Sequence, residues 1–174
     1  MKKIMSIMMM FAILVMVSVT TAYGGLFTGG AKITGIGGYC VELVNKTTTN
    51  SIAGKVASLA IGSTNTSAYV NFDGSVGVAP IGIVFEDAED IGSGTWIAFS
   101  GIVTALITTN TFASNGYYVY ANTNDSRVIA SSTMLTNNAT DYANYLIGYS
   151  LENVTNHGTN DITCKILLLP ALVR

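Results

Sequence analysis

One short pattern occurs twice in this chain, sixty-six residues apart and without a gap. Residues 81–87 read IGIVFED, and residues 147–153 read IGYSLEN. At the same offset Gly92 returns as Gly158, and an apolar stretch follows each copy. Alternate residues of an extended chain share one face, so each copy predicts a strand, an acidic turn and a second strand. A chain that repeats such a unit is constrained to a duplicated β fold.

Short apolar runs, separated by Gly, Asn, Asp or Pro, fill most of the chain from residue 39 to residue 169. Runs of this length with frequent turn signals are typical of small barrels and sandwiches. We therefore predict an all-β fold, a single small β-barrel or sandwich built from the duplication. The strands that begin at Ile81 and Ile147 should occupy equivalent positions in it. Residues 131–145 lack a clear strand pattern and predict a short helix or a long surface loop, inserted into the second repeat.

The N-terminus has the pattern of a secretory signal. Met1 and two lysines precede an apolar run from Ile4 to Val19, and small residues follow as far as Gly24. An uncleaved anchor is the competing interpretation, because this run is long for a signal core but shorter than the roughly 20 residues that span a bilayer. After this leader we predict a glycine-rich arm over residues 25–38 and a single β domain over residues 39–174.

Charge is low for a chain of this size. Eight Lys and Arg residues stand against ten Asp and Glu residues, a net charge of −2, and loss of Lys2 and Lys3 with the leader makes it −4. No basic stripe is present, so we do not expect nucleic acid as a partner. A surface of uncharged polar groups repels its neighbours weakly and suits proteins that pack together.

Cys40 and Cys164 are the two cysteines of the chain. In an exported protein an even number of cysteines predicts a disulfide, which here would tie the first strand of the domain to the last. Such a bond closes a loop of roughly 124 residues and contributes about 4 to 5 kcal/mol on the chain-entropy model. Two buried free thiols are the alternative. Two distant cysteines and one histidine are too few for a metal site.

Four carboxylates fall within five residues of the first acidic turn, at Glu86, Asp87, Glu89 and Asp90. Hard oxygen ligands this close together can hold Ca²⁺, so calcium is the one candidate cofactor. The acid spacing of an EF-hand is absent, and the second repeat carries a different set of polar residues at this turn. A solvated acidic turn is therefore the competing interpretation.

No set of residues forms a convincing catalytic site, and we do not predict an enzyme. His157 lies in a turn near Asp161, but the chain has no Gly-x-Ser-x-Gly elbow to supply a nucleophile. Glu86 and Glu152 end equivalent strands and have the appearance of a glycosidase pair. The duplication already explains that arrangement.

Five Asn-x-Ser/Thr sequons are candidate glycosylation sites of a secreted chain. They begin at Asn45, Asn65, Asn124, Asn138 and Asn153, each in a predicted loop. Trp96 and the nine tyrosines also suggest a carbohydrate-binding face. Tyr118 and Tyr120, however, have the spacing of strand residues that pack on a sheet.

Three segments, taken in order, carry a resemblance to a known family: APIGIVFEDAEDIGSGTWIAFSGIVTALI, NGYYVYANTNDSRVIAS and YLIGYSLENVTNHGTNDITCKILL. Together they resemble the small β-barrel proteins of tailed phages that decorate or cement capsids. Those proteins have an IGVA-L-E pattern, a strand ending in Ser-Gly, and a second IG-x-A-L-E pattern before the last strand. The resemblance covers about residues 68–169. It implies a barrel fold and lattice-forming contacts.

Decoration proteins of this family work in the cytoplasm of an infected cell and carry neither a signal peptide nor a disulfide. The leader and the cysteine pair therefore predict a secreted structural protein that assembles with itself into an extracellular filament, tube or surface layer. We expect assembly through the arm and the C-terminal tail, with the arm adding a strand to the next subunit. The residues concerned are Ala31, Ile33, Ile36, Leu172 and Val173. The alternatives are a virion decoration protein on a capsid lattice and an adhesin that binds carbohydrate or a cell surface.

Overall fold

A computed structural model of the chain describes residues 31–34, 38–60, 68–73, 79–122, 124–135, 145–158 and 161–170. The strands of these residues are β1 (Ala31–Thr34), β2 (Gly38–Asn45), β3 (Val56–Leu59), β4 (Ala68–Asn71), β5 (Pro80–Val84), β6 (Gly94–Ala98), β7 (Gly101–Ile107), β8 (Thr111–Ala113), β9 (Tyr118–Ala121), β10 (Val128–Ser131), β11 (Tyr145–Ser150), β12 (Val154–Asn156) and β13 (Ile162–Leu168). The predicted leader and most of the insertion over residues 131–145 lie outside the described ranges. Within those ranges, no helix is long and apolar enough to cross a membrane.

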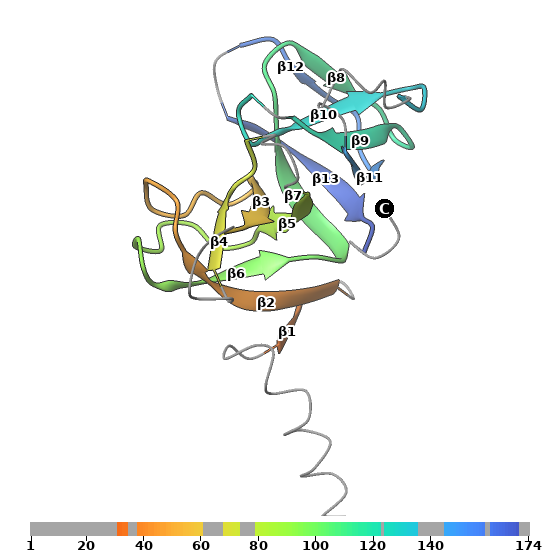
Figure 1. The fold of residues 1–174 in the computed structure, drawn as a ribbon. Coiled ribbons are helices and arrows are strands. Elements are labelled where there is room, and N and C mark those ends of the chain that lie inside the picture. The colour runs from red at the N-terminus through yellow and green to blue at the C-terminus, as the bar shows by residue number, and fades with distance from the viewer. Residues whose placement is uncertain are drawn as a thin grey trace, which may run out of the picture.

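The strands close two five-stranded barrels (Figure 1). Barrel 1 runs β2, β4, β3, β5, β6 and closes through the pairing of β6 with β2. Barrel 2 runs β10, β7, β13, β11, β9 and closes through the pairing of β9 with β10. The predicted all-β fold and the internal duplication are confirmed, but the duplication builds two barrels and not the single barrel or sandwich that we predicted. Each repeat closes a barrel of its own because it supplies five strands.

The two barrels have the same topology. In each, the first strand along the chain pairs parallel with the third, as β2 does with β4 and β7 with β10. The first strand also pairs antiparallel with the fifth. The second strand pairs antiparallel with the third and the fourth, and the fourth with the fifth. All five pairings match in partner and direction, so barrel 2 repeats barrel 1.

The register of the pairings is repeated as well. Glu42 faces Trp96 in barrel 1, and Thr104 faces Lys165 in barrel 2. When β5 is aligned with β11 at the sequence offset of 66, the pairings of the two barrels match if β2 and β3 are aligned with β7 and β9 at an offset of 62. The last strands, β6 and β13, are then aligned at an offset of 69, from Trp96 to Lys165. The fourth strands, β5 and β11, keep the offset of 66 that the sequence repeat displays.

The Ile-Gly pair of each repeat has one structural role in both barrels. Ile81 is skipped in the register of β5 with β3, and Ile147 is skipped in the register of β11 with β9. The next residue is a glycine in each case. A Cβ on Gly82 would collide with the carbonyl oxygen of Ala98, and a Cβ on Gly148 would collide with that of Leu167. The repeated pattern thus encodes a β-bulge followed by a close approach of two strands.

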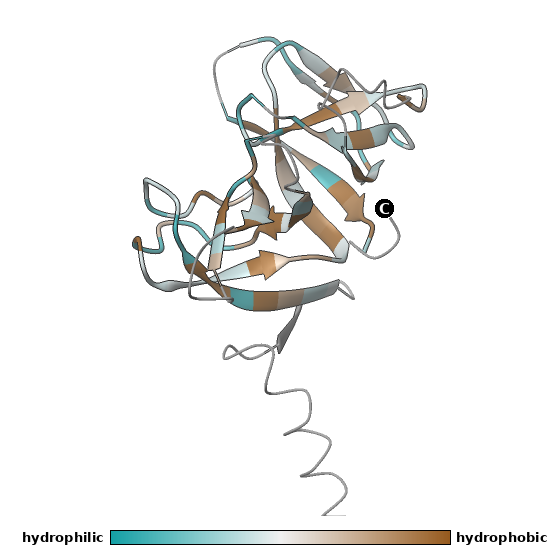
Figure 2. Ribbon diagram, viewed as in Figure 1, coloured by the Kyte–Doolittle hydropathy of each residue, from teal (hydrophilic) through white to brown (hydrophobic). Residues whose placement is uncertain are grey.

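The hydrophobic core consists of two clusters, one of which spans both barrels. One cluster fills barrel 1 and consists of Leu43, Ala57, Tyr69, Val84 and Ile97. A second cluster fills barrel 2 and extends to Cys40, Val56, Phe72, Ile83 and Ala98 of the first repeat. Across the joint, the rings of Phe72 and Tyr145 meet edge to face, with centroids 5.7 Å apart. Hydrophobic residues follow the strands of both barrels in Figure 2.

Candidate functional site

The predicted disulfide is wrong, because both cysteines are buried and no disulfide joins them. Cys40 and Cys164 belong to the same hydrophobic cluster but to different barrels. The prediction treated the first and last strands of the domain as neighbours. In the structure the last strand, β13, pairs with β7, and β2 pairs with β6 of its own repeat. Burial raises the pKa of the Cys164 thiol, whose sulfur lies 3.2 Å from the hydroxyl oxygen of Ser150.

The acidic turn does not gather a metal site. No group of three or more His, Cys, Asp or Glu residues in the described part of the chain is arranged to hold a metal ion, so Glu86, Asp87, Glu89 and Asp90 do not converge as calcium ligands. Backbone hydrogen bonds explain this, because the turn is tied to the loop before β3. The Ser51 amide donates to the Glu89 carbonyl (2.8 Å), and the Ala88 amide donates to the Ser51 carbonyl (2.9 Å). The β8–β12 ribbon occupies the corresponding place in the second repeat, with Val154 opposite Ala113.

The predicted glycosylation site at Asn45 is wrong, because the side chain is fully buried. Its Oδ1 accepts a hydrogen bond from the Thr47 amide (2.9 Å), and its Nδ2 donates to the carbonyls of Thr49 (3.1 Å) and Glu89 (3.2 Å). A glycan on this nitrogen would break both donations and would not fit in the fold. The Asn-x-Thr spacing here forms a local side-chain turn.

The other four sequons remain predictions. Asn124 and Asn153 are exposed. Asn153 also accepts a hydrogen bond from the Asn115 amide (3.0 Å) through its Oδ1, which leaves its nitrogen out of that contact. Asn65 and Asn138 lie outside the described residues.

The residues considered for catalysis do not come together as a site. His157 is exposed in its turn, and the Asp161 carboxylate pairs with Arg127. Glu152 accepts a hydrogen bond from the Lys165 amide (2.6 Å), so this carboxylate caps the pairing of β11 with β13. Its counterpart Glu86 stands at the equivalent end of β5, as the duplication requires.

The aromatic residues proposed as a carbohydrate-binding face mostly serve packing. Tyr69 and Tyr120 are buried, and Trp96 packs against the core cluster of barrel 2. Tyr118 and Tyr149 are half-buried and lie in contact, with ring centroids 5.5 Å apart.

The predicted assembly strand pairs within its own chain. Residues Ala31 and Ile33 of β1 lie opposite Val41 and Tyr39 of β2. Three residues link the two strands, so local pairing costs little loop-closure entropy compared with crossing to another subunit. Ile36, Leu172 and Val173 lie outside the described residues.

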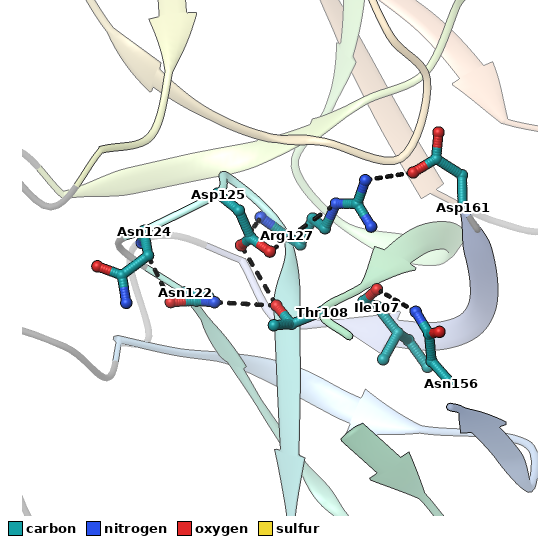
Figure 3. Close-up of polar contacts among 8 residues, drawn as sticks. All are labelled: Ile107, Thr108, Asn122, Asn124, Asp125, Arg127, Asn156 and Asp161. Atoms are coloured by element: carbon teal, nitrogen blue, oxygen red, sulfur yellow. Dashed lines mark hydrogen bonds and ion pairs between the residues drawn. The ribbon is translucent and has the colours of Figure 1, made fainter. Parts of the chain in front are cut away.

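A polar network that sequence reasoning missed surrounds the turn between β9 and β10 (Figure 3). The Thr108 hydroxyl donates to Asp125 (3.3 Å) and accepts from the Asn122 side chain (2.9 Å). Arg127 forms ion pairs with Asp161 and with Asp125, and in the second pair its Nε lies 3.8 Å from the carboxylate. Asn and Asp residues two apart in the stretch NTNDSR were the available signal, because such spacing favours side-chain turns.

This network holds a turn that reaches barrel 1. Ser126, at its tip, adopts a φ of 58°, and its carbonyl accepts a hydrogen bond from the Val56 amide (2.7 Å). The Leu106 amide donates to the Gly54 carbonyl (2.9 Å) in a second backbone link between the repeats. The network consists of ion pairs and hydrogen bonds that tie this turn to Thr108 and Asp161. Its arrangement suits a clamp between the barrels.

No family model matches the chain, and no curated protein matches it. Among solved structures, the chain is similar to the crystal structure of the N base of the head fibre protein gp8.5 of bacteriophage phi29. The sequence identity is 11%, the match covers 75% of this chain and 92% of that chain, and the TM-score is 0.45.

Proposed function

We propose that this chain is a structural protein of a virion surface that decorates a capsid lattice. One observation carries the proposal. The residues on which the resemblance to phage decoration proteins depends are the ones that build both barrels. Ile81 and Ile147 occupy equivalent bulges, and Gly82 and Gly148 admit equivalent carbonyl oxygens. The resemblance is therefore supported by the geometry that its residues produce as well as by their order in the chain.

Two further features favour a virion protein over a secreted filament. No disulfide joins the two buried cysteines, so the fold does not depend on an oxidising compartment. The arm strand that was expected to join subunits pairs with β2 of its own chain. Neither feature requires the protein to leave the cell in which it folds.

The apolar leader from Ile4 to Val19 favours a second candidate function, the predicted extracellular filament or surface layer. A chain exported through such a leader would be found on cells or in the medium. The two candidates therefore differ in where the folded protein is located.

Fractionation of a culture that carries the gene separates the two candidates. Virions are banded on a density gradient, and antibody raised against the recombinant chain is used for immunoblotting and for immunogold microscopy. We expect the chain in the virion band at a constant ratio to the major capsid protein, with gold on capsids. A chain confined to virion-free fractions, with gold on cell-derived filaments, would overturn the proposal in favour of the second candidate.

A further inference from the structure

The joint between the barrels buries one row of side chains from barrel 1. The strand register places Cys40, Ala98, Ile83 and Val56 side by side across β2, β6, β5 and β3. Each is at most 1% exposed, and all four belong to the cluster that also fills barrel 2. This row is how the first barrel packs against the second.

The duplication repeats that row in barrel 2. The equivalent positions are Ile102, Leu167, Tyr149 and Tyr118, which the register places side by side across β7, β13, β11 and β9. We call them the tyrosine row. Leu167 is 40% exposed and the other three are half-buried. Four neighbouring strands make the row roughly 14 Å wide. Its side chains are larger than those of the buried row, yet no further barrel lies against them in the described chain.

On the other side of the joint, the buried residues belong to barrel 2 and their more exposed equivalents belong to barrel 1. In barrel 2, Val103, Ile147 and Leu168 are 1 to 3% exposed and belong to the shared cluster. Val103 also lines a groove together with Ile83 of barrel 1, which places it at the joint. The equivalent residues of barrel 1 are Val41, Ile81 and Phe99, and all three are half-buried. We call them the open patch. Val41 and Ile81 pack against the core cluster of barrel 1, and the Phe99 ring stacks on that of Tyr39, but no second barrel lies against the open patch in the described chain.

We propose that the tyrosine row of one copy binds the open patch of a second copy, repeating between molecules the joint that lies within each molecule. Each side of the internal joint occurs once fully buried against another barrel and once partly exposed without one, so a barrel of the same kind is the occupant that fits both partly exposed surfaces. The low net charge opposes such contact only weakly. Because the two surfaces differ, the contact is head-to-tail and continues from copy to copy. The inference goes beyond the virion role, because gold labelling can place the chain on capsids even if its copies do not bind one another.

Single substitutions in the full chain test each surface separately. Leu167→Asp places a charge in the tyrosine row, and Phe99→Asp places one in the open patch. Phe112→Asp is the matched control, because Phe112 is 50% exposed in β8 and belongs to neither surface. Sedimentation velocity over a concentration series should show association of the wild type and of the control. We expect each of the other two variants to associate at least about tenfold more weakly.

A mixing experiment tests the head-to-tail geometry. Leu167→Asp retains an intact open patch and Phe99→Asp an intact tyrosine row, so an equimolar mixture should form dimers that grow no further. Thermal melts check folding, and Tyr149→Ser with Val41→Ser replaces any variant that unfolds. A monomeric wild type, association of either variant equal to that of the wild type, or a mixture without dimers would overturn the proposal.

Discussion

At the scale of single residues, the fold depends on two glycines that the repeat places sixty-six residues apart. Each lies where a strand carbonyl approaches too closely for a Cβ, and each follows a bulged isoleucine. The sequence alone made this pair visible because β5 and β11 keep a constant offset. It could not reveal the reason, since the colliding oxygens of Ala98 and Leu167 come from strands paired in three dimensions.

We predict that Gly82→Ala and Gly148→Ala each lower the free energy of unfolding by about 2 to 4 kcal/mol, because backbone must move to admit the methyl group. Gly94→Ala is the control. A Cβ there meets the side chain of Glu42, which is half-buried and can move aside, so the cost should stay below about 1 kcal/mol. Urea denaturation of the three variants measures this. Equal effects at all three positions would contradict the account of the close approach.

Two buried tyrosines differ in how their hydroxyls are satisfied. The Tyr120 hydroxyl accepts a hydrogen bond from the Leu135 amide (2.7 Å). The hydroxyls of Tyr69 and Thr95 make no hydrogen bond of normal geometry within the described residues. We predict that Tyr120→Phe costs about 1 kcal/mol of stability, whereas Tyr69→Phe is neutral or stabilising by about as much. A loss at Tyr69→Phe as large as at Tyr120→Phe, measured by thermal unfolding, would show that the Tyr69 hydroxyl has a partner.

Burial of Cys164 links stability to pH. Its pKa in the folded protein is raised, so above the pKa of an unfolded cysteine, about 8.5, the unfolded chain binds fewer protons than the native one. Stability contributed by the protonated thiol is therefore complete below that pH and is lost as pH rises through the native pKa. The urea midpoint should fall between pH 7 and pH 9.5, and less steeply in Cys164→Ala. If the urea midpoint fell equally steeply with pH in the wild type and in Cys164→Ala, this would count against a raised pKa of Cys164.

At the scale of strands and turns, the sequence repeat predicted less than the duplication contains. The fourth strands share an offset of 66, but the first strands are offset by 62 and the fifth by 69, so gaps hide their equivalence in the sequence. The acidic turn was interpreted from its carboxylates, although its backbone bonds to Ser51 determine its shape. The clamp around Arg127 joins residues from separate elements, and local patterns do not report such contacts.

The edge-to-face contact of Phe72 with Tyr145 joins the repeats, so the two residues should be energetically coupled. We predict a coupling energy of about 0.5 to 1.5 kcal/mol from a double-mutant cycle of Phe72→Leu and Tyr145→Leu. Phe112 and Tyr117 form a similar contact, with centroids 5.9 Å apart, within the second repeat. The cycle for Phe72 with Tyr117, which lie in different ring pairs, is the control and should give a coupling near zero. Additive effects of Phe72→Leu and Tyr145→Leu would mean that the rings do not stabilise the joint.

At the scale of the whole molecule, the duplication produces two barrels that share a core and are linked by backbone hydrogen bonds at Val56 and Leu106. The all-β class and the duplication followed from periodicity. The division into two barrels did not, because closure depends on long-range pairings such as β2 with β6 and β7 with β13. The disulfide prediction failed for the same reason. The net charge is low, and large apolar side chains such as Ile91, Phe112 and Leu167 remain exposed among polar residues. Such side chains suit the contacts with other proteins that we propose.

Cryo-electron microscopy of gradient-purified virions tests the central claim most directly. The account predicts density for paired five-stranded barrels on the outside of the capsid, at positions related by the capsid symmetry. The two barrels should be resolved, with the chain passing from the first to the second between β6 and β7. A capsid surface without that density, in particles from a culture in which the chain is abundant elsewhere, would contradict it.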